Sequence, residues 1–324
     1  MRIVTLEEHT SFPEMSALLP ESVLKDRRSL GLMQDKLADI TGERLSSMRE
    51  TGISTQVLSI ENTDVYLLSG GDAANFASKY NDLLAEKIKS HPESFAAFAL
   101  LPVSNPAAAA AELERTVKTY GFRGAMIKGT INGEFLDAPK YAPIFERAEA
   151  LGVPIYIHPG IPPATVINAY YSNVGDTPGP NEAIACYGWG WHSETAIHIL
   201  RLLAAGVFDR YPRLKIIIGH MGEMLPMMWS RANKVFTPGM GGKNKRTLME
   251  TFKAQLFITT SGIFSPAPLQ LVIDTIGIDN VMFSIDYPFS SNQVGVDFLH
   301  ALQLPAEQLA KIAHLNADRL LGLK

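Results

Sequence analysis

The sequence predicts an α/β fold in which eight parallel strands close into a (β/α)8 barrel, the TIM barrel. Three observations support this fold: short apolar runs alternate with stretches of helical period, most of these runs are continuously apolar, and there are eight of them. Continuous apolar runs are typical of strands buried on both faces of a parallel sheet. The expected strands cover residues 2–9, 56–60, 95–102, 122–129, 154–159, 214–221, 256–261 and 281–287. An open doubly wound sheet is the alternative, and the lack of a Gly-x-Gly-x-x-Gly turn after the first strand weakens it.

Helical stretches lie between these strands, as a sheet of parallel strands requires. Residues 72–91 carry apolar side chains at helical spacing, and Asn105 followed by Pro106 predicts a helix start, because proline fits the first turn. Residues 138–151 and 193–205 each end next to a glycine, the usual residue just past a helix. Strands and helices thus alternate along the chain, which favours a single domain over residues 1–324.

Composition restricts the class of protein. The chain has 324 residues, of which 46% are apolar, and its net charge of −4 offers no basic face for nucleic acid. No run of 18 apolar residues is present, so we expect no membrane span. Cys186 is the only cysteine, which excludes an intrachain disulfide and a thiolate metal site. With no signal peptide visible at its start, the chain is expected in the cytoplasm.

Two connections are long, residues 10–54 after the first strand and residues 160–192 after the fifth. Both are expected over the C-terminal face of the barrel, where barrel enzymes have their sites. The second connection is rich in tyrosine and tryptophan, which suggests a lid or a pocket wall. The alternative is a loop that packs on its own barrel or on a second subunit.

The first strand ends in Glu7, Glu8 and His9. Because alternate side chains of a strand share a face, Glu7 and His9 are expected to point one way and Glu8 the other. A carboxylate and an imidazole two residues apart suit a divalent metal ion. The alternative is an ordinary edge strand with a polar exit.

Other expected strand ends carry groups of the same kind. His158 ends the fifth strand, His220 the sixth and Asp286 the eighth, and Glu223 follows His220 by three residues. His192, beside the aromatic connection, is a minor candidate. A lone histidine at a strand end is more often structural, but candidate ligands on four strands of one barrel predict a metal site on its C-terminal face.

These segments resemble a known family. Leu-Glu-Glu-His at 6–9, Ile-His-Pro at 157–159, Gly-His-Met-Gly-Glu at 219–223 and Ser-Ile-Asp-Tyr-Pro at 284–288 look like the decarboxylase branch of the amidohydrolase superfamily. Within that branch the chain resembles hydroxybenzoate decarboxylases, such as the γ-resorcylate and 2,3-dihydroxybenzoate enzymes. The resemblance extends along nearly the whole chain.

The resemblance implies a role for each candidate residue. The implied metal ligands are Glu7, His9, His158 and Asp286. The implied catalytic residues are Asp286, His220 and Glu223. The implied substrate-binding residues are Arg231, Trp189, Trp191 and Phe289. Two carboxylates and two imidazoles without a thiolate form a hard ligand set, so Mn²⁺ or Mg²⁺ is the expected ion, with Zn²⁺ as the alternative.

Three positions depart from the family pattern: Thr10, where many members have an aromatic residue, and two at strand ends near the expected pocket. Asp64 follows the second strand, and Lys128 ends the fourth, where the family usually has asparagine. Each side chain either faces the pocket or is a surface charge. Hydrolytic members of the superfamily use a carboxylated lysine at this strand end to bridge two metals, but they have His-x-His on strand one. Because Glu7 replaces the first of those histidines here, we expect one metal ion.

Taken together, the sequence predicts a metal-dependent, non-oxidative decarboxylase of a hydroxylated aromatic carboxylic acid, in which Asp286 protonates the ring carbon. A metal-dependent hydrolase or lactonase on the same barrel is the runner-up, because a metal ion can equally activate water. A barrel that only binds a partner is the third reading. The resemblance also implies a homodimer or homotetramer that binds a small aromatic acid.

Overall fold

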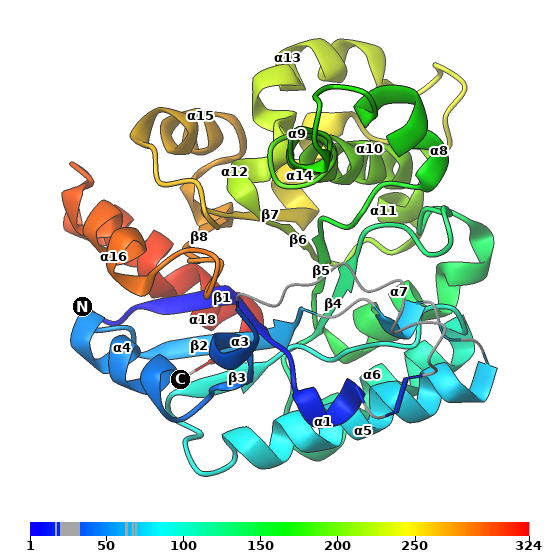
Figure 1. Cartoon of the computed structure of the whole chain (residues 1–324). Helices are drawn as coiled ribbons and strands as arrows, with labels where there is room; N and C mark the ends of the chain where they lie inside the picture. The colour runs from blue at the N-terminus through cyan, green and yellow to red at the C-terminus, as the bar shows by residue number, and fades with distance from the viewer. Residues whose placement is uncertain (17, 20–32, 62–63, 67, 69, 324) are drawn as a thin grey trace.

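The computed structural model describes residues 1–324 except residues 17, 20–32, 62–63, 67, 69 and 324 (Figure 1). Each of the eight predicted strands is present. Their bounds are β1 Val4–Thr10, β2 Thr55–Ile60, β3 Phe95–Ala97, β4 Ala125–Lys128, β5 Ile155–His158, β6 Ile216–Ile218, β7 Leu256–Thr259 and β8 Val281–Met282. All neighbouring strands pair in parallel, in chain order. The predicted (β/α)8 barrel is therefore confirmed.

The strands form two hydrogen-bonded sheets, β1 to β3 and β4 to β8. The first junction between them, from β3 to β4, is made by backbone bonds outside the regular strands. Ala99 forms a single parallel bridge with Ala125, and the N–H of Arg123 donates to the carbonyl of Ala97 at 2.8 Å. The barrel is thus continuous here although β3 is only three residues long.

The second junction, between β8 and β1, is made largely by side chains. The Glu8 carboxylate accepts the backbone N–H groups of Ile285 at 3.0 Å and Tyr287 at 3.1 Å. One backbone bond supports it, from the N–H of His9 to the carbonyl of Tyr287 at 2.7 Å. Glu8 therefore points away from the site and holds the last strand of the barrel against the first.

The eighth strand is shorter than the predicted 281–287 because hydroxyl groups replace its backbone ladder. The N–H of Ser284 donates to the Thr260 hydroxyl at 3.0 Å, and that hydroxyl donates to the Ser284 carbonyl at 2.7 Å. The Ser284 hydroxyl in turn accepts the N–H of Leu6 at 3.1 Å. The segment after β8 thus lies in the barrel wall without regular strand pairing.

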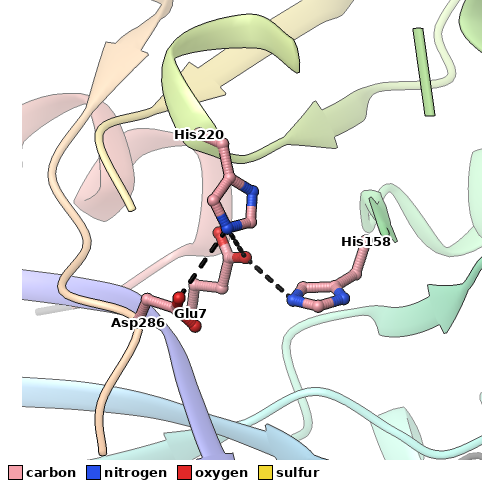
Figure 2. A group of neighbouring side chains, drawn as sticks. All are labelled: Glu7, His158, His220 and Asp286. Carbon is pink, nitrogen blue, oxygen red and sulfur yellow. Dashed lines mark ion pairs between the residues drawn. The ribbon is translucent and has the colours of Figure 1, made fainter. Parts of the chain in front are cut away.

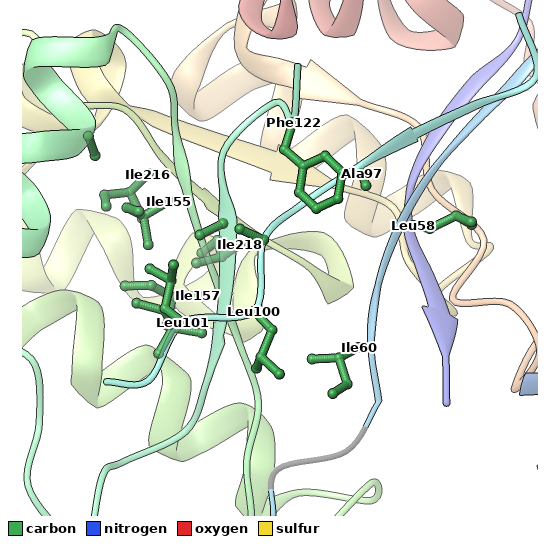
Figure 3. Packing of buried hydrophobic residues seen from close by; sticks show 14 of the residues in the cluster. Leu58, Ile60, Ala97, Leu100, Leu101, Phe122, Ile155, Ile157, Ile216 and Ile218 are labelled. Carbon is green, nitrogen blue, oxygen red and sulfur yellow. The ribbon is translucent and has the colours of Figure 1, made fainter. Parts of the chain in front are cut away.

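One layer of apolar side chains fills the barrel interior, with members from or beside each of the eight strands. These side chains are Val4, Leu6, Val57, Phe98, Met126, Tyr156, Ile217, Phe257 and Met282. The alternate residues of the same strands face outward and pack against the helices, as Ile155, Ile157, Ile216 and Ile218 do (Figure 3). This alternation over continuously apolar runs is what burial on both faces requires.

A break in pairing register lies in β1 between Thr5 and Glu8. Leu6 packs in the interior layer with Tyr156, and Glu7 hydrogen-bonds to the same tyrosine, so two consecutive residues share the inner side. A strand bulge of this kind lets the apolar start of the strand and the polar pair Glu7 and His9 both face the interior. With strict alternation along β1, Leu6 and the pair Glu7 and His9 would face opposite sides of the sheet.

Helices surround the barrel (Figure 1). Before β5 they are α1 Pro13–Ser16, α3 Gln34–Ala38, α4 Glu43–Thr51, α5 Gly70–Ile88, α6 Pro106–Tyr120 and α7 Ala142–Leu151. After β5 they are α8 Ala164–Val166, α9 Pro178–Ala185, α10 Gly190–Ala204, α11 Val207–Arg210, α12 His220–Glu223, α13 Leu225–Val235, α14 Leu248–Gln255, α15 Pro266–Ile276, α16 Asn292–Ala301, α17 Ala306–Ala310 and α18 Asn316–Leu321. No helix in the described part of the chain is both long and apolar enough to cross a membrane.

The predicted helices are present, with shifted bounds. The helix predicted at 72–91 is α5 Gly70–Ile88, and the one predicted at 138–151 is α7 Ala142–Leu151, which follows a 3₁₀ helix at Pro139–Tyr141. Asn105 caps α6 by accepting the N–H of Ala108 at 3.2 Å, and Gly152 ends α7 in the left-handed conformation. The helix predicted at 193–205 begins earlier, at Gly190, because the N–H of Ser193 already donates to the carbonyl of Trp189.

The connection 160–192 is largely helical. It contains α8, a π-helical turn over Ile167–Tyr171 and α9. Tyr171, Ala185 and Cys186 form a small buried cluster within this segment. The segment thus has a core of its own above the barrel, while its exposed aromatic residues remain available to the site below. Of the connection 10–54, residues 17 and 20–32 lie outside the described structure.

Candidate functional site

A cavity of about 1000 Å³ opens at the carboxyl ends of the strands. Its polar side includes His9, His158, His220 and Asp286, which come from different strand ends, and also Glu61, His192 and Glu223. Its remaining walls are mainly apolar and aromatic, and come from the segment before α10 and from α13 and α15. The predicted strand-end residues therefore gather at the bottom of one cavity.

Four of these groups form a compact cluster (Figure 2). Glu7 Oε1 lies 3.0 Å from His158 Nε2 and 3.7 Å from His220 Nε2. Asp286 Oδ2 lies 3.7 Å from the same nitrogen of His220. One potential ligand atom from each residue lies within 4.8 Å of all the others, which is compact enough to surround one ion.

His9 adjoins this cluster as the fifth group. Its Nε2 lies 3.1 Å from Asp286 Oδ1, and its Nδ1 lies 3.2 Å from the Ser59 hydroxyl. Glu7 and His9 thus point to the same side of β1, as the alternation predicted. The hydroxyl contact at Nδ1 leaves Nε2 as the nitrogen that faces the cluster.

Three hydroxyl groups contact the Glu7 carboxylate on the side away from the histidines. Tyr156 and Ser261 donate to Glu7 Oε2, and Thr259 lies 3.4 Å from the same oxygen. Gly219 covers the carboxylate on another side, where a Cβ atom would lie only 2.3 Å from Oε2. One oxygen of Glu7 is therefore fixed by the protein, and the other, Oε1, is directed toward the histidines.

The cluster has the properties of a metal site. Glu7 Oε1 and His9 Nε2 are buried and make no hydrogen bond with a described residue, and their nearest contacts, at 3.0 and 3.1 Å, are with other candidate ligands. Buried polar atoms without partners cost free energy, unless another group satisfies them. Carboxylate oxygens and imidazole nitrogens are suitable ligands for Mn²⁺, Mg²⁺ or Zn²⁺. The residues present therefore fit one divalent ion.

Burial and mutual charge set the protonation of these groups. Burial alone would raise the pKa of Glu7, but His220 and the hydrogen bonds to the carboxylate lower it well below its usual range. Burial lowers the pKa of His9 well below its usual value, so the imidazole is neutral and able to bind a metal. Burial raises the pKa of Asp286, against the opposing effect of His220. The pKa of one carboxyl group in the cluster is thus lowered, and that of the other is raised.

The turn after β6 places His220 and Glu223 with unusual backbone angles. His220, Met221, Glu223 and Met224 all have positive φ, between 46° and 65°, and Asp286 has φ of 72°. Non-glycine residues rarely adopt these angles, and such strain is concentrated at functional sites. The backbone is therefore strained at two of the places where the site needs a side chain.

Glu223 joins two histidines. Its Oε1 accepts His220 Nδ1 at 2.9 Å, and its Oε2 accepts His192 Nδ1 at 2.7 Å. The other ring nitrogen of His192 lies 3.1 Å from the Tyr187 carbonyl. Glu223 thus contacts His220, three residues before it, and His192 connects both to the aromatic segment before α10. From the sequence His192 is only a minor candidate, because no spacing rule links it to residue 223.

Comparison with known proteins identifies the family. Residues 15–323 match the model of the amidohydrolase family. The chain belongs to the amidohydrolase family. Among curated proteins, it is 39% identical to the decarboxylase orsB of Emericella nidulans over 98% of this chain and 96% of that protein. It is 36% identical to a γ-resorcylate decarboxylase of a Rhizobium species, over 99% and 98% of the two chains.

Solved structures give the same relationship. A dihydroxybenzoic acid decarboxylase from a Polaromonas species, determined with bound manganese and the inhibitor 2-nitroresorcinol, is 33% identical. It superimposes with a TM-score of 0.87 and covers 99% of this chain and 97% of its own. The predicted family resemblance is confirmed, and so is the assignment of the chain to the metal-dependent carboxy-lyases.

The predicted substrate-binding residues fall into two groups. Trp189, Trp191 and Phe289 line the cavity, as predicted. Arg231 lies on the exposed side of α13 and does not line the cavity of its own chain. The three aromatic residues are thus placed to contact a ring, and substrate binding by these residues and by Arg231 stays a prediction.

Lys128 is neither a surface charge nor a residue of the cavity lining. Its side chain is 3% exposed, and its Nζ lies 2.5 Å from Glu61 Oε2. The Lys128 side chain therefore contacts Glu61, and the expectation of a single metal ion stays a prediction. Asp64 begins the short 3₁₀ helix 64–66, and its side chain lies outside the described structure.

Proposed function

We propose that this chain is a metal-dependent, non-oxidative decarboxylase of a hydroxylated aromatic carboxylic acid. One observation carries the proposal: unpartnered ligand atoms of Glu7 and His9 lie beside Asp286 at the bottom of a cavity with aromatic walls. The related decarboxylases make an aromatic acid the preferred substrate class.

Glu7, His9, His158 and Asp286 are the proposed ligands of a single ion, with Mn²⁺ or Mg²⁺ preferred and Zn²⁺ as the alternative. When bound, the ion orients the substrate carboxylate and its neighbouring hydroxyl and stabilises negative charge on their oxygens. His220 is proposed to contact the substrate, because its Nδ1 is committed to Glu223 and its Nε2 faces the cluster. Trp189, Trp191 and Phe289 then provide the apolar surfaces for the ring.

Asp286 is the proposed general acid. Direct loss of carbon dioxide from an aromatic ring would leave an aryl anion, so the ring carbon must first gain a proton. The Asp286 carboxyl gives its proton to that carbon, and a carbon–hydrogen bond forms. The bond to the carboxylate then breaks, its electron pair restores the aromatic ring, and carbon dioxide leaves. Burial, which raises the pKa of Asp286, favours the protonated form that this step uses.

Isotope labelling tests the proposal. In D₂O, the decarboxylated product is expected to carry one deuterium at the carbon that held the carboxylate. In ¹⁸O-labelled water, no label is expected in the aromatic product. A metal-dependent hydrolase or lactonase would give the reverse pattern, with solvent oxygen in the product and no deuterium on the ring. A barrel that only binds ligands would release no product from either class of substrate.

We also propose that the chain assembles as a homodimer or homotetramer. Met227 and Met228 on α13 are 75% and 55% exposed, and Tyr187 and Trp189 at the mouth of the cavity are 62% and 53% exposed. Large exposed apolar side chains that gather on one face are typical of protein contacts. Sedimentation at micromolar concentration that shows only the 35.5 kDa species would contradict this proposal.

A further inference from the structure

Glu61 is a charged residue of the cavity that the proposed reaction does not use. It directly follows β2 and lines the cavity together with His9 and Asp286. Its side chain is 11% exposed, so most of it is enclosed by protein. An acidic group so close to a site that accepts an anionic acid requires an explanation, because like charges repel.

Lys128 provides part of that explanation. Its Nζ lies 2.5 Å from Glu61 Oε2, and at 3% exposure it has no access to bulk water. Lys128 ends β4, two strands away from the end of β2, so the barrel itself brings the two charges together. The pair has no net charge, and an anionic substrate can therefore approach Glu61 without the full repulsion of an isolated carboxylate.

Glu61 neither orients His9 nor serves mainly to stabilise the fold. Its Oε2 lies 3.6 Å from His9 Nδ1, beyond hydrogen-bond distance, while the Ser59 hydroxyl lies 3.2 Å from that nitrogen. Ser59, and not Glu61, is therefore the residue that orients His9. A stabilising ion pair is also a weak explanation, because burying two charges generally costs as much as their attraction returns.

One oxygen of Glu61 remains available. Lys128 occupies Oε2, and Oε1 has no hydrogen-bond partner in the part of the chain that the structure describes. An ionised carboxylate can only accept hydrogen bonds, so a ligand group that meets Oε1 must be a donor. On a hydroxylated aromatic acid, the available donor is a ring hydroxyl.

We propose that Glu61, held and neutralised by Lys128, is a specificity-determining residue that accepts a hydrogen bond from a second ring hydroxyl of the substrate. This hydroxyl is distinct from the one beside the carboxylate that the metal site takes. The inference rests on the proposed function, and it assigns recognition of this second hydroxyl to Glu61. A site built around a hydroxyl discriminates strongly against the analogue that lacks it, because its polar group is then left unpaired.

The test compares 2-hydroxybenzoate with the four dihydroxybenzoates that add a hydroxyl at ring position 3, 4, 5 or 6. Both kcat/KM and the dissociation constant are measured for each acid with the Mn²⁺-loaded protein. The variants are Glu61→Gln, which keeps the shape of the side chain, and Glu61→Leu combined with Lys128→Met, which removes both charges together. Glu86→Gln, whose partner Lys89 is also on the surface, is the matched control.

The wild-type protein is expected to prefer one dihydroxybenzoate over 2-hydroxybenzoate by about tenfold or more, the effect of one hydrogen bond to a charged group. The double variant is expected to remove most of that preference, because it should weaken kcat/KM and binding of the preferred dihydroxybenzoate more than those of 2-hydroxybenzoate. Glu61→Gln keeps an oxygen that can accept a hydrogen bond and is expected to remove only part of the preference. The control variant should keep the full preference.

Three outcomes overturn the inference. The first is a wild-type protein that binds and converts all five acids equally. The second is a variant in which kcat/KM and affinity fall by the same factor for all five acids. The third is a preference that survives in the double variant. Failure of the proposed function has a different signature, namely no carbon dioxide from any acid. The dissociation constants then still decide the role of Glu61, because the preference for a hydroxyl is measurable without turnover.

Discussion

Tyr156→Phe tests how the barrel interior controls the metal site. The tyrosine ring belongs to the apolar layer inside the barrel, and its hydroxyl donates to Glu7 Oε2 and lies 2.8 Å from the Thr259 hydroxyl. Phenylalanine keeps the ring and removes only the oxygen. The variant therefore isolates one of the donors that leave Glu7 with a single free oxygen.

The size of the effect follows from the contacts that remain. A hydrogen bond to a charged group contributes about 1.5–3 kcal/mol, and loss of a partner that orients a ligand typically weakens metal binding about 10–100-fold. Ser261 still donates to Glu7, and its hydroxyl lies 2.6 Å from that of Thr259, so part of the network can regroup. We therefore expect Mn²⁺ binding to weaken about tenfold, toward the lower end of that range.

Competition with a chelator of known affinity measures the dissociation constant for Mn²⁺ in both proteins. Thermal unfolding of the metal-free forms checks that the variant is folded. Tyr170→Phe, at a side chain that is 74% exposed, is the matched control and should leave the constant unchanged. A folded Tyr156→Phe protein with a Mn²⁺ constant within about threefold of the wild type would refute the reasoning.

Three further predictions concern the metal, the histidine pair and pH. Chelated protein should regain activity with Mn²⁺ or Mg²⁺, and full recovery with Zn²⁺ alone would show that the ligand set is softer than argued. His220→Asn should lose most activity while retaining most of the metal, and Glu223→Gln should lose less, because it removes only orientation; metal analysis of His220→Asn that finds little metal would make this histidine a primary ligand. Burial lowers the pKa of His198 from 6.5 to about 3, and its Nε2 accepts the N–H of Leu136 at 3.0 Å. The unfolded chain therefore takes up a proton first as the pH falls, so the free energy of unfolding should fall by up to about 1.4 kcal/mol per unit between pH 6.5 and 3. Chemical unfolding of His198→Gln should show a weaker dependence over this interval, and an unchanged slope would mean that other groups cause it.

The fold and the central cluster could be predicted because they depend on local patterns and on one general rule. Continuous apolar runs identify strands buried on both faces, and the rule that strand ends of a barrel meet on one face brings residues 7, 158, 220 and 286 together. The ends of the strands could not be predicted in the same way. β8 stops at Met282 because side-chain hydroxyls take over its hydrogen bonds, and no periodicity in the sequence signals that exchange.

The missed residues share a physical reason. His192 meets Glu223, and Glu61 meets Lys128, through contacts between segments that are far apart in the chain. Each of these side chains alone is compatible with a solvated charge, and only the three-dimensional packing shows its partner. Arg231 shows the opposite case, since a position suggested by resemblance lies outside the cavity of its own chain.

The junction between β8 and β1 has a consequence for how this site can change during evolution. Glu7 and His9 lie on one side of the junction and Asp286 on the other, and Glu8 and Ser284 connect the two sides by side-chain hydrogen bonds. A regular backbone ladder would fix that spacing for any sequence, whereas side chains are subject to substitution. A conservative replacement such as Ser284→Thr can therefore adjust the distance between the two parts of the ligand set while the rest of the barrel stays intact. The distance between the ligands on β1 and Asp286 can thus change during evolution while the fold stays the same.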